Sequence, residues 1–156
     1  MAANIQAYLE NLQQPWGQIY YDILFEQLKD IKGKRVLDFG SGFGLVANHL
    51  AKENQILAVE PNEEMVALRV QDHSYQQLVG SLDRLAGLED ASFEVILCHN
   101  VEDRKAVLKE FTRLLKPDGL LSIVKHNEVG RVLQTVVFEN DAQKALDLLA
   151  GQDLET

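Results

Sequence analysis

The sequence has a single cysteine, Cys98, among its 156 residues. One cysteine excludes an internal disulfide and any zinc site built from four cysteines, and it fits a reducing compartment. No apolar run approaches the roughly 20 residues that a membrane helix needs. The first residues, Met1 to Asn4, lack the basic region and following apolar stretch of a signal peptide. We therefore expect a cytoplasmic protein with no membrane partner.

Basic side chains are also scarce. The chain carries 15 lysines and arginines against 24 acidic residues, which gives a net charge of −9. Proteins bind nucleic acid nonspecifically by neutralising phosphates with lysine and arginine. The charge therefore disfavours a nucleic-acid partner, which would need a local basic groove, and we expect a small-molecule partner instead.

The rest of the composition is that of a globular protein, with 46% hydrophobic and 25% charged residues. The length suits one domain. We predict a single domain over residues 1–156, with an N-terminal helical segment at 1–32, a core at 33–125 and a C-terminal helical segment at 126–156. Trp16, Tyr20 and Tyr21 are expected to pack against the core, and a lid over a ligand is the alternative. The helical spacing predicts two apolar faces, one in the helix at about 16–30 and one in the C-terminal segment. The first face consists of Ile19, Ile23 and Leu24, and the second of Ala142, Ala145, Leu146, Leu148 and Leu149.

The core alternates apolar runs with helical patterns. The runs predict strands at 35–39, 55–60, 75–79, 93–98 and 120–124. Helices are predicted at 45–52, from 62 onward and at 102–115, with a turn at 116–119. This alternation predicts an α/β fold, a doubly wound, Rossmann-like parallel sheet of about five strands. Ligands of such sheets bind outside the carboxyl ends of the strands.

A glycine-rich turn follows the first predicted strand, in the sequence Asp38-Phe-Gly-Ser-Gly-Phe-Gly44. Glycines let the backbone turn tightly and approach a ligand with no Cβ in the way. Glu60 closes the second predicted strand, where a carboxylate can accept hydrogen bonds from both ribose hydroxyls. The turn and the acid together predict a nucleoside site. The fingerprint of dinucleotide-binding proteins has its third glycine one position later than Gly44, so the spacing disfavours a dinucleotide as the ligand.

The Asp-x-Gly-x-Gly-x-Gly pattern from Asp38 to Gly44 resembles the first motif of the class I S-adenosylmethionine-dependent methyltransferases. The second strand with its acid at Glu60, the strand 93–98 and the stretch 114–120 are similar to that family in the same order. The resemblance covers about residues 35–125. It implies S-adenosylmethionine as the cofactor, S-adenosylhomocysteine as the product and methyl transfer to an unidentified acceptor as the activity.

The same resemblance implies roles for individual residues. Asp38 and the turn would hold the methionine moiety, Glu60 the ribose, and residues after the second and third strands the adenine. Asp83 is the nearest acid to the family's adenine contact. The implied cofactor-binding residues are Asp38, Gly40, Ser41, Gly42, Gly44, Glu60, Pro61, Asn62, Met65, Gly80, Ser81, Leu82, His99 and Asn100.

Methyl transfer from a sulfonium depends mainly on orientation, and it needs a general base only when the acceptor loses a proton. His99, after the fourth predicted strand, is the candidate base, and a histidine bonded to backbone is the equal alternative. His126 is a weaker candidate. Cys98 points to the opposite face from His99 and is expected to be a buried apolar residue. The four histidines show no metal spacing, so no metal is expected.

The sequence departs from the family in two places. The family's sheet has seven strands, whereas only five are predicted here, and the two C-terminal edge strands are missing from the pattern. An exposed fifth strand would favour homo-oligomers. The loop after Val101 is also short. These departures keep open a noncatalytic module that binds the cofactor or a protein partner.

Two further alternatives remain. Residues 120–127 with Gly130 are similar to bacterial tRNA wobble-uridine carboxymethoxy-modifying methyltransferases, which makes tRNA modification a minor alternative. A nucleotide-dependent oxidoreductase is disfavoured by the glycine spacing.

Overall fold

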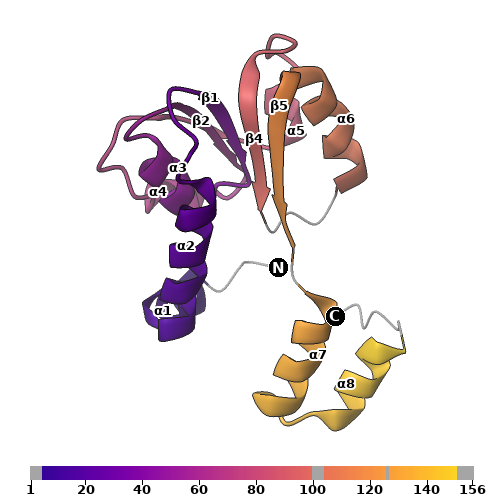
Figure 1. Cartoon of the computed structure of the whole chain (residues 1–156). Helices are drawn as coiled ribbons and strands as arrows, with labels where there is room; N and C mark the ends of the chain where they lie inside the picture. The colour runs from indigo at the N-terminus through magenta and orange to yellow at the C-terminus, as the bar shows by residue number, and fades with distance from the viewer. Residues whose placement is uncertain (1–4, 100–103, 126, 151–156) are drawn as a thin grey trace. The chain divides into compact units, whose positions relative to one another are not determined.

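A computed structural model describes residues 5–99, 104–125 and 127–150. The chain separates into two compact units, residues 1–123 and 124–156. The first unit contains a five-stranded sheet in the order β3-β2-β1-β4-β5 (Figure 1). The strands are β1 (Arg35–Phe39), β2 (Gln55–Glu60), β3 (Gln76–Val79), β4 (Phe93–His99) and β5 (Leu115–Val124).

The strand order is that of a doubly wound sheet, because the chain moves outward from β1 to β3 and then returns to the other side of β1. β1 is parallel to both β2 and β4, and β2 is parallel to β3. The arrows of β4 and β5 point the same way in Figure 1. The predicted α/β, Rossmann-like fold is confirmed. The prediction of one domain over 1–156 stays a prediction.

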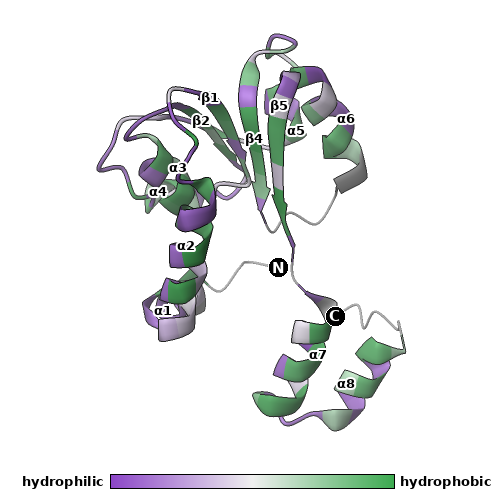
Figure 2. Ribbon diagram, in the orientation of Figure 1, coloured by the Kyte–Doolittle hydropathy of each residue, from purple (hydrophilic) through white to green (hydrophobic). Residues whose placement is uncertain are grey.

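Helices cover both faces of the sheet. They are α1 (Ile5–Gln13), α2 (Pro15–Leu28), α3 (Leu45–Leu50), α4 (Glu63–Ala67), α5 (Leu82–Leu85) and α6 (Arg104–Leu114). α5 and α6 bury Leu85, Phe111 and Leu114 in one apolar cluster with Leu37 and Ile96 of the strands. Figure 2 shows the strands of the sheet largely in the green of hydrophobic residues. This cluster is the main core of the first unit.

The opposite face of the sheet carries α3 and the N-terminal helices. The side chains of Val36, Asp38 and Ala58 point to this face, because successive residues of a strand alternate between faces. The Phe25 ring stacks on His49 of α3, with centroids 3.8 Å apart, and ties α2 to that helix. The Tyr8 ring lies 5.3 Å from the ring of Phe43 in the glycine-rich turn. The N-terminal segment therefore packs beside the predicted cofactor site.

Several local predictions differ from the structure. In α2, Leu24 and Leu28 are buried, whereas Ile19 and Ile23 of the predicted apolar face are exposed. Trp16 is 61% exposed, so the expected packing of this ring against the core is wrong. The helix α5 was not predicted, because its four residues are too few to show a period.

The fifth strand begins earlier than predicted and includes residues 116–119, which the sequence indicates as a turn. Asp118 nevertheless has a φ of 64°, a left-handed value typical of turns. The residues predicted to form a turn therefore interrupt the extended backbone of β5 at Asp118.

The second unit is a pair of helices, α7 (Glu128–Val137) and α8 (Ala142–Leu149). Asn127 caps α7 by accepting from the Val129 amide at 3.0 Å, and Asp141 caps α8 by accepting from the Lys144 amide at 2.9 Å. Thr135 and Ala145 are buried, whereas Leu146 and Leu149 of the predicted apolar face are exposed. Among the helices in the described ranges, none is long and apolar enough to cross a bilayer.

Candidate functional site

The glycine-rich turn lies at the carboxyl end of β1, where the fold predicts a ligand. Gly40, Gly42 and Gly44 all have positive φ, at 80°, 54° and 70°. A Cβ on Gly44 would lie 2.2 Å from the hydroxyl oxygen of Tyr75, so any larger residue would have to displace that side chain. A Cβ on Gly42 would meet nothing within 4 Å. The turn is thus packed tightly at Gly44 and open at Gly42, where a ligand can approach the backbone.

Glu60 connects the end of β2 to this turn. Its Oε2 accepts a hydrogen bond from the Gly42 amide at 2.8 Å, and its Oε1 accepts one from the Asn62 amide at 2.9 Å. The side chain is only 7% exposed. Each carboxylate oxygen keeps a second lone pair for a donor. The two oxygens are therefore held in a fixed orientation that suits the two hydroxyls of a ribose.

Asp38 is the buried acid of the site. It is 3% exposed, and a hydrogen bond from the Ala47 backbone helps to hold its charge. Its Oδ2 is buried and has no hydrogen-bond partner among the described residues. Burial, with the nearby Glu60 charge, raises the pKa of Asp38 to about 7. An unpartnered buried carboxylate oxygen is costly unless a ligand supplies a donor or a positive charge.

The residues predicted to surround the adenine lie after β2 and β3. Asn62 uses its Oδ1 to cap α4, accepting from the amides of Glu64 and Met65 at 3.0 and 3.1 Å. The Gly80 amide donates to the Glu60 carbonyl at 3.0 Å, which brings the ends of the two strands together. Pro61 follows Glu60 directly, and Met65 lies in the first turn of α4. These residues form one side of the site.

Two residues near the predicted adenine contact, Asp83 and Leu82, contact other parts of the protein in the structure. Asp83 accepts from the Ser81 amide at 2.8 Å, so its carboxylate faces the backbone at the start of α5. Leu82 packs against the main apolar core. Whether Ser81 and Leu82 bind adenine stays a prediction.

His99, the candidate base, ends β4 beside the glycine-rich turn. Phe39 pairs with Cys98, so His99 lies next to the register position of Gly40. Asp38 pairs with Leu97, and His99 therefore points to the same face as Asp38. The His99 Nε2 is 3.1 Å from the Ser122 hydroxyl of β5, and burial lowers its pKa to about 4. Among the described residues, the ring of His99 is bonded to the Ser122 side chain, and the lowered pKa favours the neutral imidazole. Asn100 and His126 lie outside the described residues.

Two polar residues of the site were missed in the sequence. Gln77 of β3 lies on the Asp38 face, since Asp38 and Gln77 both pair with Ala58. Its Nε2 donates to the Ser41 hydroxyl at 3.4 Å, and its Oε1 is buried without a partner in the described part of the chain. Ser122 is the other. A polar residue inside a predicted apolar strand is the only signal that could have found either one.

Tyrosines of the N-terminal helices also approach the site. The hydroxyls of Tyr8 and Tyr21 are 3.0 Å apart. Burial is the main cause that raises the pKa of Tyr21, and the Asp38 charge adds to it. The lid interpretation of this segment stays open for Tyr21, whereas Trp16 is exposed.

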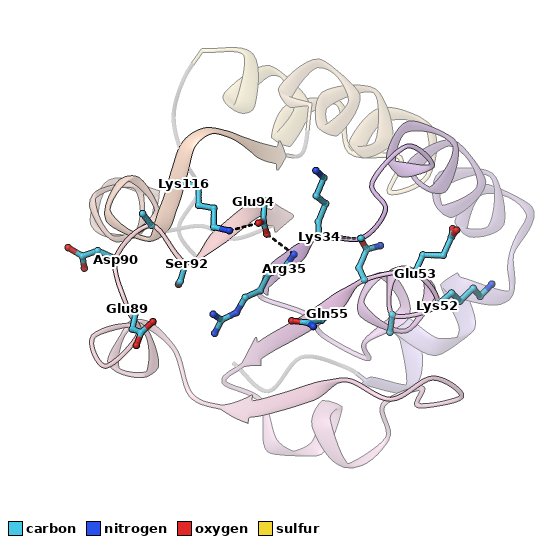
Figure 3. Close-up of a pocket in the computed structure, with 14 residues that line it drawn as sticks. Lys34, Arg35, Lys52, Glu53, Gln55, Glu89, Asp90, Ser92, Glu94 and Lys116 are labelled. Atoms are coloured by element: carbon cyan, nitrogen blue, oxygen red, sulfur yellow. Dashed lines mark hydrogen bonds and ion pairs between the residues drawn. The ribbon is translucent and has the colours of Figure 1, made fainter.

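A groove of about 790 Å³ lies elsewhere, at the amino ends of the strands (Figure 3). Lys116 forms an ion pair with Glu94, whose other oxygen accepts from the Arg35 amide at 2.8 Å. The groove contains none of the predicted cofactor residues. Its charged side chains belong to this end of the sheet, and we place the functional site at the opposite, carboxyl end. Across the described ranges no group of three His, Cys, Asp or Glu residues is arranged to hold a metal ion.

Comparisons with known proteins show the family of the chain. Residues 37–123 match the family model described as a methyltransferase domain. The chain is 29% identical over 131 residues to the thiol S-methyltransferase TMT1B of Rattus norvegicus, covering 74% of this chain and 54% of the relative. It is 34% identical over 102 residues to a ubiquinone biosynthesis O-methyltransferase of Xanthomonas oryzae pv. oryzae, covering 59% and 43%. The chain spans about half the length of these curated relatives.

A solved structure shares the fold. The S-adenosylmethionine-dependent methyltransferase from Mesorhizobium loti superposes with a TM-score of 0.56 at 22% identity, covering 64% of this chain and 50% of that one.

Proposed function

Because this chain belongs to the class I S-adenosylmethionine-dependent methyltransferase family, we propose that it binds S-adenosylmethionine and methylates a small-molecule acceptor. The observation that carries the proposal is the pairing of two buried acids at the glycine-rich turn. Asp38 has an oxygen without a partner, and Glu60 is fixed by backbone amides. A nucleoside with a cationic amino-acid end satisfies both acids at once.

Different residues of the site are proposed to bind different parts of the cofactor. Asp38 offers its free Oδ2 to the ammonium group of the methionine end, next to the open backbone of Gly42. Glu60 accepts from the ribose hydroxyls, while Asn62 and Met65 of the α4 end and Gly80 of the β3 end border the adenine. Gly40, Ser41 and Gly44 shape the turn. The bound cofactor supplies an electrophilic methyl group on a sulfonium.

His99 is proposed to accept the proton that a hydroxyl or thiol acceptor loses during transfer. A new bond forms between the acceptor atom and the methyl carbon as the sulfur–methyl bond breaks, and the acceptor proton moves to the imidazole. Because burial lowers the pKa of His99 to about 4, the ring is neutral and able to accept at neutral pH. A methylated oxygen or sulfur that keeps its proton is a far stronger acid, so even this weak base suffices.

The partner proposals follow from charge. The net charge of −9 supports a small molecule rather than tRNA as the acceptor. The tRNA-modifying subgroup and a cytoplasmic location stay predictions.

Calorimetric titration of the chain with S-adenosylmethionine and S-adenosylhomocysteine, with NADH as the control, tests the cofactor. Selective binding of the adenosyl pair supports the proposal. Preference for NADH would support an oxidoreductase, and a folded sample that binds neither would overturn the proposed function. Binding without turnover across hydroxyl and thiol acceptors would support the noncatalytic module.

Glu60→Gln tests the ribose contact. We expect S-adenosylhomocysteine to bind more weakly by about 1–3 kcal/mol, the usual value of a charged hydrogen-bond partner. Glu63→Gln is the matched control, because Glu63 is an exposed acid three residues further along the chain. Equal affinity of the Glu60 variant and wild type would reject the ribose role.

A further inference from the structure

The proposed function assigns a task to His99 and leaves open which ring nitrogen performs it. One nitrogen, Nε2, is 3.1 Å from the hydroxyl of Ser122. The other, Nδ1, is buried and has no hydrogen-bond partner among the described residues. A neutral imidazole has one N–H donor and one lone-pair acceptor, and the bond at one nitrogen decides the state of the other. Ser122 is therefore placed to decide which nitrogen is basic.

Two arrangements satisfy the distance. If the serine hydroxyl donates to Nε2, the proton lies on Nδ1, and an N–H donor is buried without an acceptor. If Nε2 donates to the serine oxygen, Nδ1 is left with its lone pair. The second arrangement uses the tautomer that free histidine favours. It also leaves an acceptor at the carboxyl end of β4, on the face that carries Asp38.

We propose that Ser122 is a positioning residue that holds His99 in the Nε2–H tautomer, so that Nδ1 presents its lone pair to the methyl acceptor. The inference rests on the proposed function and deepens it. Nδ1 then suits an acceptor that donates a hydrogen, which is the property of a hydroxyl or a thiol. The proton lost on methylation passes to Nδ1 and leaves the acceptor's electron pair in the new bond to carbon.

The strand pairing explains how Ser122 reaches this ring. β5 is the neighbour of β4 in the sheet, and Ser122 lies near the carboxyl end of β5, as His99 does in β4. The flanking residues of β5, Leu121 and Ile123, are apolar, so the hydroxyl of Ser122 is the local polar group. A serine at this point places a short, directed oxygen against the ring.

Long-range proton–nitrogen NMR of the uniformly ¹⁵N-labelled full chain at neutral pH reads the tautomer directly. His99→Asn identifies the His99 signals among the four histidines. In wild type we expect Nδ1 at the shift of an unprotonated nitrogen and Nε2 at that of a protonated one. Ser122→Ala should move the tautomer ratio by about three- to tenfold toward the mixture of free histidine, as expected for one hydrogen bond. Ser122→Thr should restore the wild-type pattern.

The controls separate this inference from the proposed function. Ser92→Ala removes another buried serine hydroxyl, one without a partner among the described residues, and should leave the His99 signals unchanged. S-adenosylhomocysteine binding by Ser122→Ala shows that the variant is folded. A protonated Nδ1 in wild type, or a tautomer ratio that Ser122→Ala does not change, overturns the inference while cofactor binding by wild type still supports the function. If wild type binds no cofactor, the function fails whatever the tautomer.

Discussion

At the scale of single residues, the candidate site contains a buried carboxyl group whose ionised form is unfavourable in the folded state. Asp38 is buried, its Oδ2 has no partner within the described ranges, and its pKa is raised to about 7. A raised pKa means that the folded state binds its proton more tightly than the unfolded state, whose value lies near 3.8. The contribution to stability is complete below the unfolded value and is lost as the pH rises through 7.

The first residue-scale prediction is that Asp38→Asn flattens the pH dependence of stability. The free energy of unfolding of wild type should fall between pH 5 and 8, by a few kcal/mol at most. Asparagine keeps an oxygen for the Ala47 amide and has no proton to lose. Urea denaturation of both proteins at several pH values, without cofactor, measures the difference. Parallel curves would show that Asp38 is already ionised or is solvated.

Cofactor binding should show the opposite trend. A ligand ammonium favours the ionised form of Asp38, so affinity for S-adenosylmethionine should rise from pH 6 to pH 8, by up to about tenfold per unit below pH 7. Calorimetry at the two pH values tests this. Asp38→Asn should bind weakly at both, and an unchanged wild-type affinity would remove the ammonium contact from the proposal.

Sequence reasoning predicted Asp38 and Glu60 as site residues because a strand end, a glycine turn and an acid have fixed spacing along the chain. It did not find Gln77 or Ser122, since each acts on a residue from another strand. Gln77 reaches Ser41, 36 residues away, and Ser122 reaches His99, 23 residues away. Their roles depend on strand order and register, which a single sequence does not specify.

At the scale of elements, the glycine-rich turn combines a glycine in a tightly packed position, Gly44, with one in an open position, Gly42, where we propose that the ligand approaches. Gly44 faces the Tyr75 hydroxyl, which donates to the Val70 carbonyl at 2.6 Å. Gly42 faces open space. The two positions have similar positive φ, so an added Cβ causes similar backbone strain at both. A difference in stability between the two alanine variants therefore reports the packing around Gly44.

We therefore expect Gly44→Ala to unfold at a clearly lower temperature than Gly42→Ala. Both variants carry about 1 kcal/mol of backbone strain, and only Gly44→Ala adds a steric clash. Thermal melts followed by circular dichroism measure the difference. Tyr75→Phe removes the clashing oxygen, so it should cost less in the Gly44→Ala background than in wild type. Additive effects in that double-mutant cycle would contradict the packing argument.

The predictable elements are those with a strong local pattern. β1, β2 and β4 lie within one residue of their predicted bounds, because buried parallel strands read as continuous apolar runs. The predicted apolar face of α2 was right for Leu24, which is buried, and wrong for Ile19 and Ile23, which fit the helical period and yet are exposed. The spacing of apolar residues predicts the helix, whereas the packing of the helix against the rest of the unit determines which of its faces is buried.

At the scale of the whole molecule, the sheet leaves two edges of different character. β3 has four residues, whereas β5 has ten and exposes Leu120 and Ile123. Long, apolar edge strands invite pairing with another chain, and short ones resist it. We propose that the chain self-associates through β5, as the exposed fifth strand predicts.

Ile123→Lys tests this association, because a charge on an edge strand opposes strand pairing. Sedimentation of wild type should show a concentration-dependent dimer, which the variant loses while it still binds S-adenosylhomocysteine. Ile19→Lys is the control, since Ile19 is 57% exposed on α2 and Ile123 is 44% exposed on β5. Loss of the dimer in both variants would assign the effect to charge in general. A wild type that is monomeric at every concentration would reject the β5 interface. The left-handed backbone of Asp118 would then explain why the edge stays unpaired, because it interrupts the regular hydrogen-bond ladder that a partner strand needs.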